Sequence, residues 1–182
     1  MDKTKKYTKN HGINILWTPS KCTHAGICVK SLPKVYHPKE KPWIQPEEAT
    51  VEELIHQIKQ CPTGALDYEF TFGKDDLKQN YDTLSEAIND LRSYGYVEDF
   101  NLKQECLECR DGQFKIFHDQ FEIDKVYRFD DMSDPADEAI LYVVSSNTHK
   151  LKGVLVNGYG ISTDGVTDEM LEKLKFRGQK NR

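Results

Sequence analysis

The spacing of three cysteines constrains this chain more than any other feature of its sequence. Five residues separate Cys22 from Cys28, and Cys61, which Pro62 follows directly, lies much further along the chain. Thiolates that converge from a tight loop and from a distant Cys-Pro segment are typical ligands of iron–sulfur clusters. The pattern therefore predicts that Cys22, Cys28 and Cys61 hold a cluster.

The type of cluster stays open, because Ala25 stands where the middle ligand of a bacterial ferredoxin run would fall. Three thiolates suffice for a [3Fe-4S] cluster, or for a [4Fe-4S] cluster whose fourth iron takes His24, a water or an outside ligand. Two other roles remain open for the same thiols. They could be small buried apolar side chains, or ligands of zinc, which usually takes four Cys or His ligands in closer pairs.

Composition and charge exclude several classes of function. The longest aliphatic and aromatic run covers residues 140–144, whereas a bilayer span needs about 20 apolar residues. No apolar stretch follows the basic N-terminus, so we expect no secretory signal and a cytoplasmic protein without a membrane partner. In that reducing compartment, clustered thiols are more often metal ligands or redox groups than disulfides.

The charge is divided unevenly along the chain. Residues 1–72 carry 10 Lys and Arg against 8 Asp and Glu, and the rest carries 15 against 22. Neither part has the strong basic patch of a nucleic-acid-binding protein, so we expect no nucleic-acid partner. An acidic second part suits the docking of a basic redox partner.

Apolar periodicity predicts the elements of the first part. Thr50 and Glu53 form a capping-box pattern at the start of one helix. The predicted elements are a loose polar tail over 1–10, a strand over 13–17, one or two helical turns within 23–32, a helix over 51–60 and a strand over 65–72.

Four motifs of this part carry a resemblance to known proteins: Ile15-Leu16-Trp17, the run from Lys21 to Cys28, Pro42-Trp43-Ile44-Gln45-Pro46, and Cys61-Pro62-Thr63-Gly64. Through these motifs, residues 11–72 resemble the divergent 4Fe-4S mono-cluster family of small ferredoxin-like proteins. They resemble more distantly the three-cysteine ferredoxins of haem monooxygenases. The resemblance implies one cluster ligated by Cys22, Cys28 and Cys61 in a compact β-α-β arrangement. It implies one-electron transfer to a redox partner protein. The alternative is a non-enzymatic redox sensor or partner-binding protein with a structural cluster.

Residues 73–80 are charged and unpatterned, which predicts a linker to a second domain over 81–176. In that domain we expect a helix capped by Thr83, four strand-like stretches and a last short helix capped by Thr167. The stretches are 97–105, 113–128, 138–146 and 151–159. The fold class is therefore α+β, a small ferredoxin-like iron–sulfur domain followed by a small α+β domain with a mainly antiparallel sheet.

Cys106 and Cys109 form a C-x2-C pair in this second domain. Three roles are open for the pair: packing thiols in a hairpin, a redox pair, or metal ligands. A further hypothesis is that the pair supplies the ligand that the first domain lacks.

A second resemblance covers residues 81–175. It rests on Gly95–Leu102, Cys106–Cys109, Val126–Phe129, Ser145–Asn147 and Lys152–Val156. These are similar to a family of small bacterial proteins often labelled phosphoribosylpyrophosphate synthetase. That activity needs a phosphate-cradling loop, and the nearest candidate, Ser162–Gly165, has too few small residues. Asp130-Asp131 is expected to be a solvated turn. We predict no catalytic residues and an electron-transfer protein rather than an enzyme.

Overall fold

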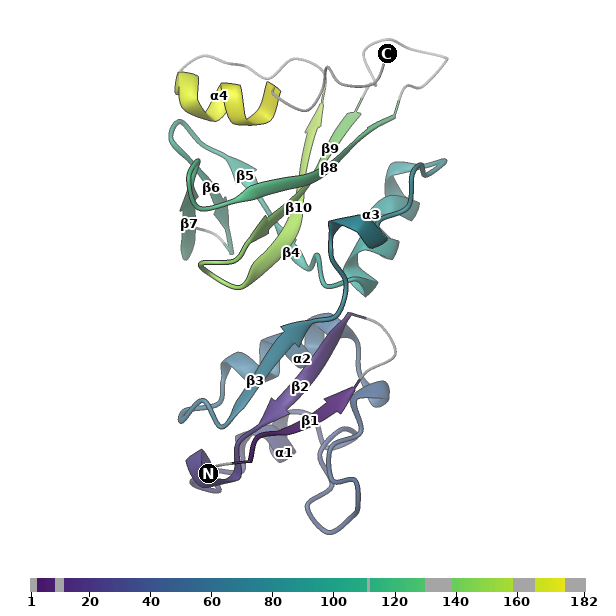
Figure 1. The fold of residues 1–182 in the computed structure, drawn as a ribbon, viewed down its shortest axis with the longest axis vertical. Helices are drawn as coiled ribbons and strands as arrows, with labels where there is room; N and C mark the ends of the chain where they lie inside the picture. The colour runs from purple at the N-terminus through teal and green to yellow at the C-terminus, as the bar shows by residue number, and fades with distance from the viewer. Residues whose placement is uncertain (1–2, 9–11, 111, 130–138, 159–165, 176–182) are drawn as a thin grey trace. The chain divides into compact units, whose positions relative to one another are not determined.

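The chain divides into two compact units, which are described separately here. The computed structural model describes residues 3–8, 12–110, 112–129, 139–158 and 166–175 (Figure 1). The first unit spans residues 1–73 with 93–95, and the second spans 74–92 with 96–182. In the described part of the chain, no helix combines the length and the apolar character that a membrane span requires.

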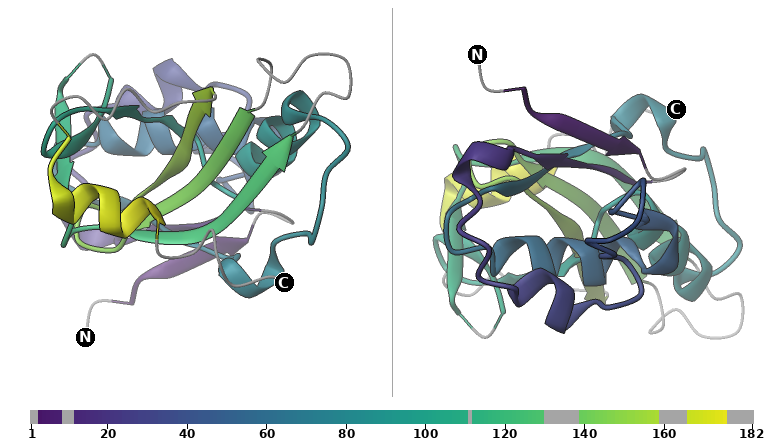
Figure 2. Two further views of the ribbon diagram at one scale, coloured as in Figure 1. Left: turned by 90° about the horizontal axis from the view of Figure 1, so that it is seen from above. Right: turned by 90° about the horizontal axis from the view of Figure 1, so that it is seen from below.

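The first unit is a three-stranded antiparallel sheet in the order β1-β2-β3, with two helices on one of its faces (Figures 1 and 2). Its central strand places Ile13 and Ile15 in the core, where both are fully buried. The strands are β1 (Lys5–Thr8), β2 (Ile13–Trp17) and β3 (Leu66–Phe70), and the helices are α1 (Ile27–Ser31) and α2 (Val51–Lys59). Short 3-10 turns, Pro19–Lys21 and Pro46–Glu48, lie in the connections.

Helix α2 begins as its sequence predicts. The backbone N–H of Glu53 donates to Thr50 Oγ1 at 3.2 Å, and Glu53 Oε2 accepts from the Thr50 N–H at 2.8 Å, so the capping box is confirmed. The face of the helix that packs on the sheet carries the predicted apolar residues, all buried: Val51, Leu54, Ile55 and Ile58.

The prediction of a loose tail over residues 1–10 is wrong for residues 5–8. They form strand β1, which pairs with β2 in a register that sets Lys5 opposite Trp17. Lys6 makes an ion pair with Glu69, and the Lys5 ammonium lies 5.3 Å from the centre of the Trp17 ring. Lysines are common on edge strands, where they discourage pairing with other chains. The Lys-rich composition therefore hid an edge strand that pairs with β2.

The second unit contains helix α3 (Leu84–Ser93) and two small sheets (Figure 1). In the larger sheet, with order β4-β10-β9-β8, the β4–β10 pair is parallel and the others are antiparallel. Its strands are β4 (Glu98–Asp99), β8 (Glu122–Phe129), β9 (Ala139–Ser146) and β10 (Leu151–Gly158). The smaller, antiparallel sheet contains β5 (Asn101–Leu102), β6 (Cys106–Cys109) and β7 (Phe114–Phe117). The mixed α+β class with mainly antiparallel sheets is confirmed.

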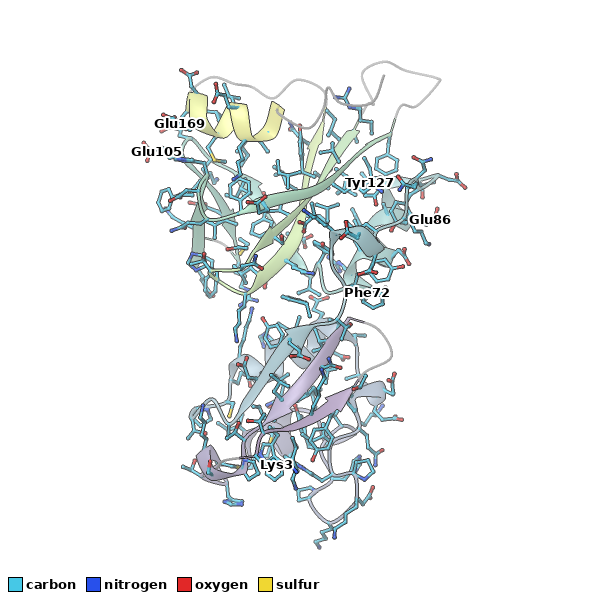
Figure 3. All side chains as sticks on the ribbon, viewed as in Figure 1. Lys3, Phe72, Glu86, Glu105, Tyr127 and Glu169 are labelled. Atoms are coloured by element: carbon cyan, nitrogen blue, oxygen red, sulfur yellow. The ribbon has the colours of Figure 1, made fainter. Side chains whose placement is uncertain are left out.

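Both sheets of the second unit and the last helix share one core. Helix α4 (Asp168–Lys175) buries Met170 and Leu174 against Leu107, Ile116 and Val144, among other residues. On another part of the unit lies Tyr127, which is labelled in Figure 3. The centre of its ring is 5.0 Å from that of Tyr81, and its hydroxyl donates a hydrogen bond to the Lys78 carbonyl at 2.7 Å. The segment predicted as a linker, 73–80, thus contributes a 3-10 turn (Lys74–Asp76) and contacts with β8.

Two predicted strands are each divided in the structure. The stretch 97–105 separates into β4 and β5 at Phe100, so its two halves join different sheets. The stretch 113–128 is interrupted by a turn, in which the Gln120 N–H donates to the Phe117 carbonyl at 2.9 Å. The Gln120 side chain closes the same turn by accepting from the Phe117 N–H at 3.2 Å.

Gly153 lies opposite Glu98 where β10 pairs with β4, and we expect Gly153→Ala to destabilise the second unit. A Cβ at this position would lie 2.1 Å from the Glu98 carbonyl oxygen, so the backbone of β4 would have to move. Overpacking of this kind costs about 1–3 kcal/mol or more. Urea unfolding followed by far-ultraviolet circular dichroism measures the loss. Val156→Ala, at an exposed site on the same strand, is the control, and equal midpoints for the two variants would contradict the expectation.

Candidate metal centre

Cys22, Cys28 and Cys61 line one cavity of about 550 Å³ in the first unit. The three thiols are free and partly buried. They come from two segments: the loop that leads into α1 provides Cys22 and Cys28, and the turn after α2 provides Cys61. The structure thus brings together the three residues that the sequence singles out.

Backbone geometry in the first segment turns Cys22 and Cys28 toward the same space. The Cys22 N–H closes a 3-10 turn on the Pro19 carbonyl at 3.0 Å. His24 and Gly26 then adopt left-handed conformations, with φ of 56° and 71°, before α1 begins at Ile27. A positive φ is uncommon for a residue other than glycine, so His24 marks a sharp change of chain direction. His24 and Ala25 also line the cavity.

The end of α2 fixes Cys61. Its N–H donates to the Ile58 carbonyl at 3.0 Å, and its carbonyl accepts from the Gly64 N–H at 3.3 Å. Gly64 has a φ of 61°, a conformation that glycine adopts without steric cost. The chain therefore reverses within a few residues and enters β3 at Leu66, which holds the thiol at the cavity wall.

Hydrogen-bond donors surround the Cys61 sulfur. Burial raises the pKa of the Cys61 thiol, but the backbone N–H groups of Leu66, Thr63 and Ala65 and the Thr63 hydroxyl outweigh burial, so the pKa is lowered overall. Thr63 Oγ1 lies 3.9 Å from Cys61 Sγ. The turn is thus built to stabilise a thiolate, which is the form that binds metal.

Cys28 lies in a different environment. Burial raises the pKa of its thiol, the Val29 N–H opposes this, and the charges of Cys22 and Cys61 raise it further. The thiols of Cys22 and Cys61 therefore lie near enough to Cys28 for their charges to affect its pKa.

Within the described ranges, no group of three Cys, His, Asp or Glu side chains forms a site that could hold a metal ion. Zinc usually takes four Cys or His ligands, with closely spaced pairs. In an iron–sulfur cluster the thiolates bind different irons, so three cysteines from two segments are a donor set that suits a cluster.

Three buried donors in the cavity wall also fit an anionic group. The indole Nε1 atoms of Trp17 and Trp43 and the amide Nε2 of Gln57 have no hydrogen-bond partner among the described residues, and all three side chains line the cavity. The Trp17 and Trp43 rings pack edge-on with their centres 4.8 Å apart, which makes this wall aromatic. Buried donors without partners are costly, and sulfide or thiolate acceptors would satisfy them. Sequence reasoning missed Gln57, although it lies one helical turn before Cys61.

Cys106 and Cys109 lie in the second unit, on strand β6. Side chains three residues apart on a strand point to opposite faces, and Cys109 alone of the two joins the core cluster of Leu107 and Ile116. Burial, followed by the charge of Glu108, raises the pKa of the Cys106 thiol. The geometry favours the packing role over a redox pair or a shared ion. Donation of a ligand to the first unit stays a prediction.

The residues considered for phosphate or magnesium binding are not placed in the structure. Ser162–Gly165 and Asp130-Asp131 lie outside the described residues.

Comparisons with known proteins concern the cysteine-rich segment. Residues 8–70 match the family described as divergent 4Fe-4S mono-cluster. The chain is similar to the uncharacterized protein YjdI of Escherichia coli, in strain K12 and in O157:H7. In each case it is 39% identical over 56 residues, which cover 31% of this chain and 74% of that protein. No solved structure matches the chain.

Proposed function

Because this chain belongs to the divergent 4Fe-4S mono-cluster family through residues 8–70, we propose that it is a one-electron carrier with a single cluster bound by Cys22, Cys28 and Cys61. The family description supports an iron–sulfur cluster. The assignment of the ligands and of electron transfer is our proposal.

One observation carries the proposal: three free thiols from two distant segments line the same cavity. Each segment is held by its own backbone turn, which fixes its cysteines at the cavity wall. Ligands held in this way lower the cost of binding, because little conformational freedom is lost.

The residues of this chain would bind the cluster, limit its contact with water and adjust its potential. When bound, the cluster would supply reversible one-electron reduction. Trp17 and Trp43 provide an apolar wall that keeps water from that side of the cavity. The N–H groups of Thr63, Ala65 and Leu66 would offset negative charge at the Cys61 sulfur.

Three thiolates leave one position of a four-iron cluster without a cysteine. Ala25, in the cavity wall, cannot fill it, whereas His24 lies beside it in the same loop. We propose His24 or a water for this position in a [4Fe-4S] cluster. A [3Fe-4S] cluster would need no fourth ligand.

Anaerobic reconstitution with iron and sulfide tests the proposal. We expect one cluster per chain by iron and sulfide analysis, a broad brown absorbance, and an electron paramagnetic resonance signal that appears and disappears reversibly in a redox titration. A protein that stays colourless and free of iron would refute cluster binding. A cluster that is lost on each reduction would refute the carrier role and favour the sensor.

A further inference from the structure

Gln57 is a buried amide that the cluster ligands do not account for. We propose that its Nε2 group donates a hydrogen bond to the cluster sulfur in the cavity and raises the reduction potential, and that Tyr36 positions the amide for this role. The inference rests on the proposed function, since it assumes a cluster in this cavity.

The Gln57 amide is buried, so an amide atom without a hydrogen-bond partner costs free energy. Its side chain is 2% exposed, on the inner face of α2, and it lines the cavity one turn before Cys61. An amide removed from water without hydrogen bonds costs a few kcal/mol. Its Oε1 accepts a hydrogen bond from the Tyr36 hydroxyl, whereas its Nε2 has no partner among the described residues.

Tyr36 determines which end of the amide is left for the cavity. The Tyr36 side chain is itself 1% exposed, and its ring packs 5.8 Å from that of Trp43. Gln57 lines the cavity, and Tyr36 is not among the lining residues. With Oε1 held by the tyrosine hydroxyl, the nitrogen is the end that remains to donate toward the cavity.

The thiols are also within electrostatic reach of this pair. Burial raises the pKa of the Tyr36 hydroxyl, and the charges of Cys28 and Cys61 raise it further. The hydroxyl therefore stays protonated at neutral pH and keeps donating to Gln57.

A donor at this position would favour the reduced state. Reduction adds one negative charge to the cluster, and hydrogen bonds to its sulfurs are among the factors that set its potential. A hydrogen bond to a more negative acceptor is stronger, so the Nε2 group would stabilise the reduced form more than the oxidised form.

The midpoint potential of the reconstituted full-length protein tests this role. We expect Gln57→Leu to lower the equilibrium constant for reduction by about tenfold, which corresponds to 59 mV for one electron. Gln57→Glu should lower it further, because a carboxylate replaces the donor. Tyr36→Phe, which keeps the ring and loses the hydroxyl, should lower it by less. Gln113→Glu adds the same charge at an exposed site of the second unit that does not line the cavity, and it should leave the potential almost unchanged.

Iron and sulfide contents separate the possible failures. An unchanged or raised potential in Gln57→Leu with a full cluster would overturn the inference and leave the proposed function intact. If Gln57→Leu does not fold, an unchanged potential in Tyr36→Phe overturns it instead. A wild-type protein that binds no cluster would refute the proposed function itself.

Discussion

Replacing Cys61 with serine is expected to leave the reconstituted protein without its iron, its sulfide and its brown absorbance. Cys61 is the one thiol in the cavity wall that comes from the segment after α2, so its loss leaves the cluster attached to the first loop alone. The un-ionised hydroxyl of serine is a poor substitute for a thiolate. The effect should exceed the roughly 10–100-fold fall in affinity that follows mutation of residues behind metal ligands.

Cys106→Ser in the second unit is the matched control. It removes a buried thiol that does not line the cavity, and we expect full iron and sulfide contents. Circular dichroism of both variants checks that the fold is kept. A Cys61→Ser protein with the wild-type iron content and potential would show that this residue is not a ligand.

Arg110→Met is expected to destabilise the second unit by about 3–5 kcal/mol, the cost of removing one member of a buried ion pair. Glu98 is 5% exposed, and its carboxylate accepts two hydrogen bonds from the Arg110 guanidinium, one of them from Nε at 2.8 Å. Domains are typically stable by about 5–15 kcal/mol, so such a loss is a large part of the total. Denaturant unfolding followed by circular dichroism measures it.

Two further variants test the cause of this effect. Glu98→Leu/Arg110→Met removes both members of this ion pair, so the double variant should regain much of the stability. Arg92→Met breaks the 3.1 Å pair with Asp99, whose side chain is 69% exposed, and should cost about 1 kcal/mol or less. If Arg110→Met and Arg92→Met unfold at the same denaturant concentration, burial does not govern the cost.

Elements with local signals could be predicted from the sequence. Helix α2 has a capping box and an apolar face, both readable within ten residues, and it forms where expected. Strand β1 has no such signal, because it is stabilised by pairing with β2 and by contacts of its lysines with Glu69 and Trp17, which only the folded sheet brings near. The division of the predicted strand 97–105 into β4 and β5 has no local signal either. It depends on the different sheets that β4 and β5 join, and long-range packing determines this.

The site could be predicted in part for the same reason. Cysteine is rare and its spacing is informative, so the three thiols that meet at the cavity could be chosen from sequence. Gln57 could not, because a glutamine in an amphipathic helix is usually read as exposed, and its burial depends on Tyr36 from another segment. The opposite faces of Cys106 and Cys109 become evident once they are known to lie on a strand.

The aromatic wall gives this protein an internal optical reporter. The chain has two tryptophans, and both lie at the cavity, in edge-on contact. A chromophore bound there would absorb where indoles emit and would quench them at short range. Fluorescence excited selectively at tryptophan should therefore follow the filling and emptying of this one cavity. The second unit, which has no tryptophan, contributes nothing to that signal.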